Sequence, residues 1–299
     1  MKKKILIEAS GGLTAGYLIK CIQASGYKCV ASDINNDSLG KLLADEFVIV
    51  PKSKDKILWK KIETIINKLK IDIIIPSLDE TLVEWSRRKS YFENKYKVHI
   101  IISDIKTINI CNDKWLTYKF FKEIGIPTPN TSLEQKFKLI KPRQGRGSKN
   151  IMITKEAINM KKMISQELLK GKEVTIDIFC DVNNSPIYII PRERTLVIDG
   201  KSVDGKVIKN SLITKYVKII CKNLKFVGPI NMQCFILQNK SIKFFEINPR
   251  IGGGMALGFA ASENWIPLIQ KNLINKNKIV PKKIQYGLNM KRFYVEKFV

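Results

Sequence analysis

The first hundred residues alternate short apolar runs with segments of helical pattern, and this alternation restricts the fold more than any other feature of the sequence. The runs are KILIEA, CVASD, FVIVP, DIIIPS and HIIIS. Strands that are apolar along most of their length and alternate with helices form a parallel sheet covered by helices on both faces. We therefore predict an α/β domain with a parallel sheet over residues 1–110.

The turn after the first predicted strand is rich in glycine. Gly11, Gly12 and Gly16 lie there, but they do not form the pattern G-x-G-x-x-G that marks a dinucleotide site. A nucleotide at this turn, with Asp33 on its ribose, is one interpretation. We favour the other, in which the glycines allow a tight turn or admit a different ligand.

The segment PSLDE, residues 76–80, ends the fourth predicted strand. Crevices at the carboxyl ends of strands in such sheets hold ligands, so this segment is a candidate binding loop. Ser77 or Asp79 can instead cap the helix that follows. Of the two interpretations we favour the helix cap.

The character of the sequence changes after the segment CNDKWLTYKFFKEIGIPTP, which begins at Cys111. Asn112 or Asp113 can cap a helix that runs to Ile124, and the glycine and prolines after it end that helix. From there on strands dominate, and short turns containing Asn or Gly predict antiparallel pairing. We expect a domain boundary near residue 111.

The chain carries a formal net charge of +26, and a basic surface attracts phosphates of every kind, including those of nucleic acids. The lysines are spread along the chain, however, and no RNA-binding or helix-turn-helix signature stands out. A basic nucleic-acid-binding protein therefore stays the minority hypothesis. Arginine is scarce, and most of it lies in the segments discussed below. Its planar guanidinium grips phosphate or carboxylate with two parallel bonds.

Composition also disfavours several classes of protein. The six cysteines are scattered without a C-x-x-C pair, which is typical of small buried side chains in a reducing compartment. The single histidine, His99, lies within an apolar run, so we expect it in the core and exclude His-based triads. The apolar runs are strand-sized and predict neither a signal peptide nor a membrane span. We expect a cytoplasmic protein.

The segment KFFEINPRIGGG, residues 243–254, combines a buried strand with a polar face. Side chains at positions i and i+2 project from the same face of a strand, so Glu246 and Asn248 present oxygen atoms to one point in space. A hard cation such as Mg²⁺ prefers such ligands and shares its coordination with phosphates. The alternative is an ordinary strand end at the surface, and this segment alone does not decide between them.

The segment KPRQGRGSKN, residues 141–150, places two glycines, a serine and four cations in a loop between two predicted strands. It does not fit the Walker pattern G-x-x-x-x-G-K-[ST]. A glycine-rich hairpin can nevertheless fold backbone N–H groups over phosphates. Lys141, Arg143 and Arg146 would add positive charge there.

Five elements follow one another in a defined order: Lys114, the KP with its glycine loop, QELLKGKE, NMQ and EINPR. In this order and at these separations they resemble the ATP-grasp superfamily, in the branch near the large subunit of carbamoyl-phosphate synthetase and related carboxylate–amine ligases. The resemblance covers nearly the whole chain. It implies a Rossmann-like domain over residues 1–110, followed by an α+β ATP-grasp domain over residues 111–299. In that domain two antiparallel-sheet subdomains, a lid at about 113–165 and a catalytic part at 166–299, grip the nucleotide.

The resemblance also implies the nucleotide contacts. Lys114 and Lys141 match the lysines that contact the phosphates of ATP. The loop that closes over those phosphates matches Gly145, Arg146, Gly147 and Ser148. The hinge that reads adenine matches Gln166, Glu167 and Leu169, and the carboxylate that binds ribose matches Glu173. Gln166 departs from the pattern, because many relatives have Glu at its position.

By the same resemblance, Gln233, Glu246 and Asn248 match the magnesium ligands, and Arg250 matches the arginine at the transferred phosphate. Many relatives have a carboxylate where this chain has Gln233, although the carbamoyl-phosphate synthetase branch also has a glutamine. Transfer of a phosphoryl group needs positioning and charge neutralisation more than a side-chain nucleophile. That requirement agrees with a chain that has no candidate Ser or Cys triad.

Two further segments bear on the substrate. Arg192 and Arg194 share one face of a predicted strand by the i, i+2 rule, so they could clamp the substrate carboxylate and the acyl phosphate. We favour this role over that of a solvated strand face. The glycine run 252–254 leads into a helix at about Met255. Its N-terminal N–H groups could bind an anion, or the glycines could serve close packing alone.

The resemblance implies an ATP-dependent ligase that activates a carboxylate as an acyl phosphate and joins it to an amine, releasing ADP and phosphate. Its cofactors would be ATP and Mg²⁺, with Mn²⁺ as a substitute, and its partners a small carboxylate and an amine, an amino acid or amino sugar among them. A homodimer is compatible with these expectations. The alternative enzyme is a carbamoyl-phosphate-synthetase-like subunit that makes an acyl or carbamoyl phosphate for another protein.

Overall fold

The computed structural model of the chain describes residues 2–12, 15–147, 150–198, 201–293 and 298. Its first part is a five-stranded parallel sheet in the order β3-β2-β1-β4-β5, as the sequence predicted. The strands are β1 (Lys4–Ile7), β2 (Lys28–Asp33), β3 (Glu46–Ile49), β4 (Ile73–Ile75) and β5 (His99–Ile100). The helices between and after them are α1 (Ala15–Ala24), α2 (Leu39–Leu43), α3 (Leu58–Leu69), α4 (Leu82–Tyr96) and α5 (Ile105–Asn112).

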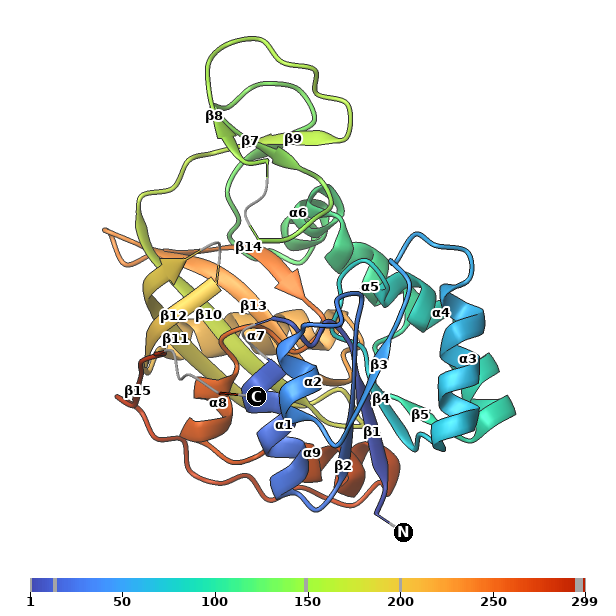
Figure 1. The fold of residues 1–299 in the computed structure, drawn as a ribbon. Coiled ribbons are helices and arrows are strands. Elements are labelled where there is room, and N and C mark those ends of the chain that lie inside the picture. The colour runs from blue at the N-terminus through green and yellow to red at the C-terminus, as the bar shows by residue number, and fades with distance from the viewer. Residues whose placement is uncertain (1, 13–14, 148–149, 199–200, 294–297, 299) are drawn as a thin grey trace.

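Helices cover both faces of this sheet, which explains its apolar strands (Figure 1). Ile5 and Ile7 of β1 pack on the side of α1, whereas Leu6 between them packs with residues of α3 and α4 on the opposite side. All three side chains are buried. A strand that is buried on both faces has no polar face to present, and the sequence accordingly shows none.

The largest sheet has six antiparallel strands in the order β14-β13-β10-β11-β12-β15. They are β10 (Gly171–Cys180), β11 (Pro186–Ile198), β12 (Lys201–Val207), β13 (Gly228–Leu237), β14 (Ile242–Asn248) and β15 (Asn289–Met290). Helix α7 (Ser211–Asn223), which the sequence analysis did not identify, packs its apolar side on the inner residues of β10. Its N-cap is Asn210, whose side chain accepts a hydrogen bond from the backbone N–H of Ile213 at 3.0 Å.

A small four-stranded antiparallel sheet, in the order β6-β9-β7-β8, projects above the other two (Figure 1). Its strands are β6 (Thr131–Ser132), β7 (Leu139–Pro142), β8 (Met152–Ile153) and β9 (Met163–Gln166). Helix α6 (Lys114–Glu123) precedes it. This helix begins at Asp113, whose carboxylate accepts from the backbone N–H groups of Trp115 and Leu116, so the predicted cap at Asp113 is confirmed.

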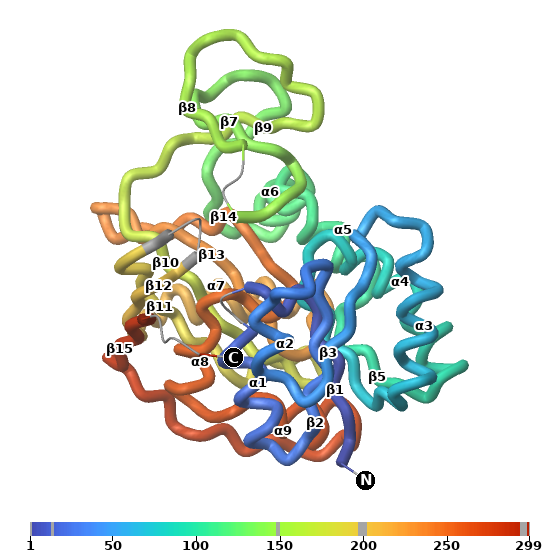
Figure 2. The backbone as a smooth tube through the Cα atoms, in the orientation of Figure 1, coloured from blue at the N-terminus to red at the C-terminus, as the bar shows by residue number. Residues whose placement is uncertain are grey.

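The C-terminal elements return to the parallel sheet, as the tube drawing shows (Figure 2). They are α8 (Ala256–Ala261), α9 (Ile266–Leu268) and the π-helical segment η1 (Ile269–Ile274). Buried Trp265 packs against Phe179 of β10, Tyr188 of β11 and Phe259 of α8. The same apolar cluster contains Ile5 and Ile7. One core therefore joins the parallel sheet to the six-stranded sheet.

Two expectations about single residue types, and one about membrane spans, can be compared with the fold. All six cysteines are buried and unbridged, as predicted. His99, by contrast, is exposed, so its predicted core position is wrong. It lies on β5, an edge strand of the sheet, where side chains alternate between the core and solvent and Ile100 takes the core position. Within the part of the chain that the structure describes, no helix is both long and apolar enough to span a membrane.

Candidate active site

A cavity of about 190 Å³ lies where the carboxyl end of the parallel sheet faces the six-stranded sheet. The parallel sheet and its loops contribute Glu8, Gly12 and Ser77 to its wall. The opposite wall and the loop after β7 contribute eight of the residues singled out from the sequence, which are Arg146, Gly147, Arg192, Arg194, Gln233, Glu246, Asn248 and Arg250. The fold thus brings together residues that lie more than two hundred positions apart in the sequence, such as Glu8 and Arg250.

The three predicted metal ligands lie side by side on β13 and β14. Gln233 is directly opposite Glu246, and Asn248 follows two residues later on the same strand face. The amide of Asn248 already has protein partners, since its Nδ2 donates to Asn231 at 3.2 Å and its Oδ1 accepts from Arg250 at 3.4 Å. The described residues contain no group of three or more His, Cys, Asp or Glu that could hold a metal.

One carboxylate and two amides are hard oxygen donors of the kind that Mg²⁺ prefers, so the residues fit this ion chemically. They supply too few ligands and too little charge for a site made by the protein alone. A cation held here by Glu246 would need further oxygens from a ligand such as a phosphate chain.

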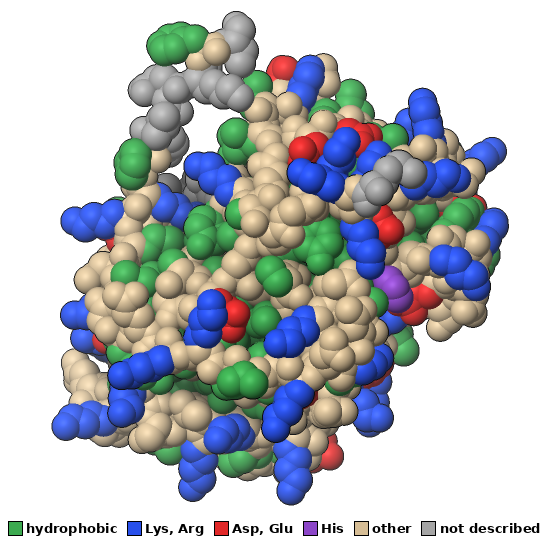
Figure 3. Space-filling model, turned by 90° about the horizontal axis from the view of Figure 1, so that it is seen from below, with side chains coloured by type: hydrophobic (Ala, Val, Ile, Leu, Met, Phe, Trp, Pro, Cys, Tyr) green, Lys and Arg blue, Asp and Glu red, His purple; other side chains and the backbone are tan. Residues whose placement is uncertain are grey.

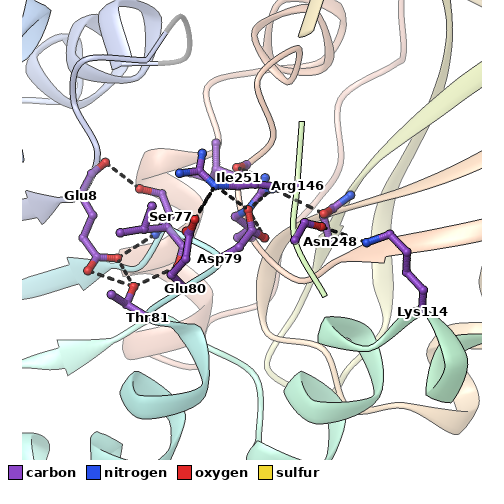
Figure 4. Close-up of polar contacts among 12 residues, drawn as sticks. Glu8, Ser77, Asp79, Glu80, Thr81, Lys114, Arg146, Asn248 and Ile251 are labelled. Carbon is purple, nitrogen blue, oxygen red and sulfur yellow. Dashed lines mark hydrogen bonds and ion pairs between the residues drawn. The ribbon is translucent and has the colours of Figure 1, made fainter. Parts of the chain in front are cut away.

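Arg250 is held by the loop that follows β4. Its Nε and NH2 donate to the two carboxylate oxygens of Asp79 at 2.8 and 2.6 Å, and its NH1 donates to the carbonyl of Ile251 at 3.1 Å (Figure 4). Burial disfavours the charge of Arg250, but the carboxylates of Asp79, Glu246 and Glu80 together outweigh this effect, and the pKa of Arg250 is raised. The guanidinium is therefore a fixed positive charge at the cavity wall.

The role predicted for Asp79 and Ser77 was wrong. Helix α4 has Thr81 at its N-cap, and no side chain caps it. Asp79 binds Arg250 instead, and Ser77 donates its hydroxyl to the backbone carbonyl of Glu8 at 2.9 Å. Ser77 of the loop 76–80 lines the cavity at the strand ends, where open sheets of this type place their ligands. Ser77 and Asp79 are thus held by contacts with Glu8 and Arg250 and not by capping of α4.

The half-buried Glu8 and the buried Asp177 are two carboxylates that the sequence analysis missed. Glu8 accepts from Trp85 Nε1 at 2.8 Å and from the backbone N–H of Ser77 at 3.2 Å, and burial raises its pKa. Asp177 is fully buried in β10 beneath Arg192. An acidic residue inside a run of apolar strand residues is the signal that could have identified both, because a buried carboxylate requires partners.

The glycine loop after β7 reaches the cavity through Arg146 and Gly147. Arg146 Nε lies 3.2 Å from Glu80, and the side chain of Lys114 donates to the carbonyl of Gly145 at 2.9 Å (Figure 4). Gly145 and Gly147 adopt φ values of 119° and 67°, which side chains disfavour. Ser148, the fourth residue predicted for this loop, lies outside the described residues.

Arg143 does not join the loop cations as the sequence suggested. It forms an ion pair with Asp113, the N-cap residue of α6. Arg143 therefore holds the start of that helix, and of the two loop arginines only Arg146 lines the cavity.

Arg192 and Arg194 both line the cavity, and each has its own carboxylate on the neighbouring strand β10. Arg192 donates to Asp177 at 2.8 Å, and both side chains are buried. Arg194 pairs with Glu173, the residue predicted to bind ribose. NH1 of Arg192 is buried and has no hydrogen-bond partner among the described residues. An anion in the cavity would find a donor there.

The glycine run 252–254 serves close packing. A Cβ on Gly254 would lie 2.5 Å from NH1 of Arg192, and one on Gly252 would lie 2.5 Å from the side chain of Asn231. The helix that follows, α8, has only six residues. Of the two interpretations left open for this run, the structure supports packing. In the glycine-rich turn after β1, the backbone N–H of Gly11 donates to Asp33 at 2.7 Å. This contact favours the tight turn over a ribose contact of Asp33.

Lys141 is buried beside the predicted metal ligands. Its ammonium lies 5.4 Å from the ring centre of Phe245, and Glu246 and Glu173 act on it electrostatically. Burial nevertheless dominates and lowers the pKa of Lys141 to about 8. A buried amine of this kind needs an anion to hold its proton firmly.

The predicted adenine hinge lies apart from the cavity wall. Gln166 is buried and donates to the hydroxyl of Thr131 at 2.9 Å, and Glu167 forms an ion pair with Lys243 at 2.8 Å. Leu169 follows them and is half-buried. All three lie at or just after β9, where the chain passes from the small sheet to β10 of the large one, and their role as a hinge stays a prediction.

Comparison with known proteins identifies two regions of the chain. Residues 111–254 match the family model described as ATP-grasp domain, and residues 5–103 match the one described as PylC-like, N-terminal domain. A carbamoyl-phosphate synthase of Methanobrevibacter smithii is 24% identical over 266 residues, which cover 78% of this chain and 70% of that protein.

Two solved structures show the same fold at low sequence identity. The biotin carboxylase domain of the 2-oxoglutarate carboxylase of Hydrogenobacter thermophilus, in complex with MgADP, ADP and bicarbonate, gives a TM-score of 0.73 at 16% identity, covering 97% of this chain and 73% of that one. The N5-carboxyaminoimidazole synthetase of Staphylococcus aureus, complexed with ADP, gives 0.71 at 19% identity, covering 96% and 81%. The resemblance recognised in the sequence is confirmed for these two regions: residues 111–254 match an ATP-grasp domain, and residues 5–103, which precede it, match a PylC-like N-terminal domain.

Proposed function

We propose that this chain is an ATP-dependent ligase that phosphorylates a small carboxylate and joins the resulting acyl group to an amine, releasing ADP and phosphate. The observation that carries the proposal is the meeting of Gln233, Glu246, Asn248 and Arg250 with Arg192 and Arg194 around one cavity. Oxygen donors for a metal and guanidinium groups for anions are thereby placed within reach of a single reacting group.

Nucleotide binding falls to the region between the small and large sheets. Lys114 and Lys141 would contact the phosphates, the loop at residues 144–149 would cover them, and Gln166, Glu167, Leu169 and Glu173 would hold the nucleoside. Gln233, Glu246 and Asn248 would bind Mg²⁺, which when bound neutralises charge at the β- and γ-phosphates. Mn²⁺ can be tested as a substitute because it accepts similar oxygen ligands.

The chain's own groups would do the remaining work. Arg192 and Arg194 would orient the carboxylate towards the terminal phosphate, and Arg250 would stabilise charge on the phosphoryl group as it transfers. A carboxylate oxygen would attack the terminal phosphorus, and the bond from that phosphorus to ADP would break. The neutral amine would then attack the acyl carbon, the bond from that carbon to the phosphate oxygen would break, phosphate would leave with the electron pair, and the nitrogen would lose a proton to solvent. In this scheme residues 1–110 form one domain and residues 111–299 the ATP-grasp domain, with a lid at about 113–165.

An ADP-release screen over pairs of carboxylates and amines tests this function. Bicarbonate belongs in the panel, because the Hydrogenobacter thermophilus structure contains it. ADP formation that requires both a carboxylate and an amine, together with amide product, supports ligation. Acyl or carbamoyl phosphate without amide would instead support the second candidate, a phosphorylating subunit, which the carbamoyl-phosphate synthase relative favours. No ADP with any pair would refute both.

A basic nucleic-acid-binding protein remains the competing class. On the face shown in Figure 3, lysine and arginine side chains are scattered and are separated by neutral and apolar atoms. A protein that uses its charge to bind nucleic acid loses affinity steeply as salt increases. Weak binding to DNA and RNA without that dependence would eliminate this hypothesis.

A further inference from the structure

Two cations of the proposed phosphate site are already paired with carboxylates from the other part of the chain. Arg250 is bound by Asp79 through two hydrogen bonds, and Arg146 lies 3.2 Å from Glu80 and 3.6 Å from Asp79 (Figure 4). Asp79 and Glu80 belong to the loop between β4 and α4, whereas both arginines belong to the ATP-grasp domain. We call this loop, residues 76–80, the acidic loop.

The donors of Arg250 are almost fully used. A guanidinium has five N–H groups. Nε donates to Asp79, NH2 donates to Asp79 and Asn248, and NH1 donates to Ile251, which leaves one N–H on NH1. A phosphate needs two parallel N–H groups to be gripped in the way that makes arginine effective. Arg250 can offer such a pair to a phosphate only after it has released Asp79.

The other two arginines of the cavity differ in this respect. Arg192 and Arg194 take their carboxylates, Asp177 and Glu173, from the adjacent strand of the same sheet. Those pairs are fixed by strand register. Asp79 comes from a loop of a separate sheet, and neither it nor Arg250 is fully buried, with exposed side-chain fractions of 15% and 14%. The Asp79–Arg250 pair can therefore open without breaking a sheet.

We propose that Asp79, assisted by Glu80, stands in for a phosphate on Arg250 and Arg146 in the nucleotide-free chain, and that the terminal phosphate of ATP displaces it. This inference rests on the proposed function. ADP lacks the terminal phosphate and leaves Arg250 on Asp79. Asp79 is thus a positioning residue that acts through Arg250, and it lowers the affinity of the site for a triphosphate while leaving that for a diphosphate unchanged.

The test compares the affinities for Mg-AMP-PNP, a non-hydrolysable triphosphate, and Mg-ADP by calorimetry. Asp79→Asn removes the competing charge while keeping the size of the side chain. We expect its dissociation constant for AMP-PNP to fall about tenfold, the effect of removing one charge-assisted bond, while that for ADP stays within about twofold of the natural value. Glu80→Gln should shift the same ratio in the same direction but less, because the Arg146–Glu80 pair is about half exposed.

Glu84→Gln is the matched control, because Glu84 is a half-exposed carboxylate on the adjoining helix whose ion pairs, among the described residues, are with Arg87 and Arg88. Its ratio should not change. An unchanged or reduced preference for AMP-PNP in Asp79→Asn, with both nucleotides still bound, would overturn the exchange and leave the proposed function standing. If Asp79→Asn does not fold, the Glu80→Gln ratio decides by the same criterion. Failure of the natural chain to bind either nucleotide would refute the proposed function, and the exchange with it.

Discussion

Glu246 contributes the single formal negative charge among the three predicted metal ligands. Glu246→Gln keeps the shape of the side chain and therefore the strand, but it removes the charge that holds a hard cation beside phosphates. We expect the fold to be retained and Mg²⁺-dependent ATP turnover to fall roughly hundredfold or more, as for other groups that stabilise transferring charge.

Arg87→Lys is the control for this variant, because Arg87 lies on α4 with 59% of its side chain exposed. Its turnover should equal that of the natural chain. Full ATP turnover by Glu246→Gln at ordinary magnesium concentrations would show that the metal site has been assigned to the wrong residues.

Lys141 couples stability to pH. Its pKa in the folded chain, about 8, lies below its ordinary value of 10.5, so the unfolded chain binds more protons between these values and stability rises with pH across that window. Below pH 8 the buried charge costs on the order of 3 kcal/mol, at about 1.4 kcal/mol for each unit of pKa.

Lys141→Met removes this charge and keeps the length of the side chain. At pH 7 it should raise the free energy of unfolding of the nucleotide-free chain and weaken nucleotide binding. The stability gain over the natural chain should shrink between pH 7 and pH 9.5, which urea denaturation at the two values measures. A gain that is constant across this range would mean that folding does not lower the pKa of Lys141.

At the scale of the secondary-structure elements, the glycine run 252–254 positions Arg192 by leaving room for its guanidinium. Gly254→Ala places a methyl group 2.5 Å from the guanidinium of Arg192, which Asp177 holds in the core. We expect a loss of about 1–3 kcal/mol in stability and a raised KM for the carboxylate substrate. Gly16→Ala is the control, because its new methyl group would make ordinary contacts with Leu39 and Leu43 on α2. Equal KM values for the two variants would show that Arg192 does not bind the substrate.

The sequence predicted elements well and contacts between distant elements poorly. Strand alternation gave the parallel sheet, and the i, i+2 rule placed Glu246 beside Asn248, because both depend only on local periodicity. The partner of Arg250 did not follow from any local pattern, since Asp79 lies 171 residues away on another sheet. Asp79 also fits a helix cap by local criteria, and the local interpretation was wrong. His99 was misplaced for the same reason, because the sequence does not say which strand lies at the edge.

At the scale of the whole molecule, the shared core makes the two parts interdependent. Trp265 contacts both large strands β10 and β11 and belongs to the cluster that includes Ile5 and Ile7 of β1. Trp265→Ala should cost about 3–5 kcal/mol, and it should lower the stability of the parallel sheet and of the six-stranded sheet together. Hydrogen exchange of both sheets measures this. The exposed Val280, changed to Ala, should have little effect. A loss of protection confined to one sheet would show that the two cores are separate.

The six buried cysteines can report where the folded chain opens during unfolding. Cys21 and Cys29 lie in the first sheet region, and Cys111, Cys180, Cys221 and Cys234 lie around the second. Only the thiolate reacts with an alkylating reagent, and burial raises the pKa of Cys29 to about 12. Each buried thiol should therefore not react in the folded chain and should react only when the region around it unfolds. The order in which the six cysteines become alkylated would show the order in which the regions around them unfold.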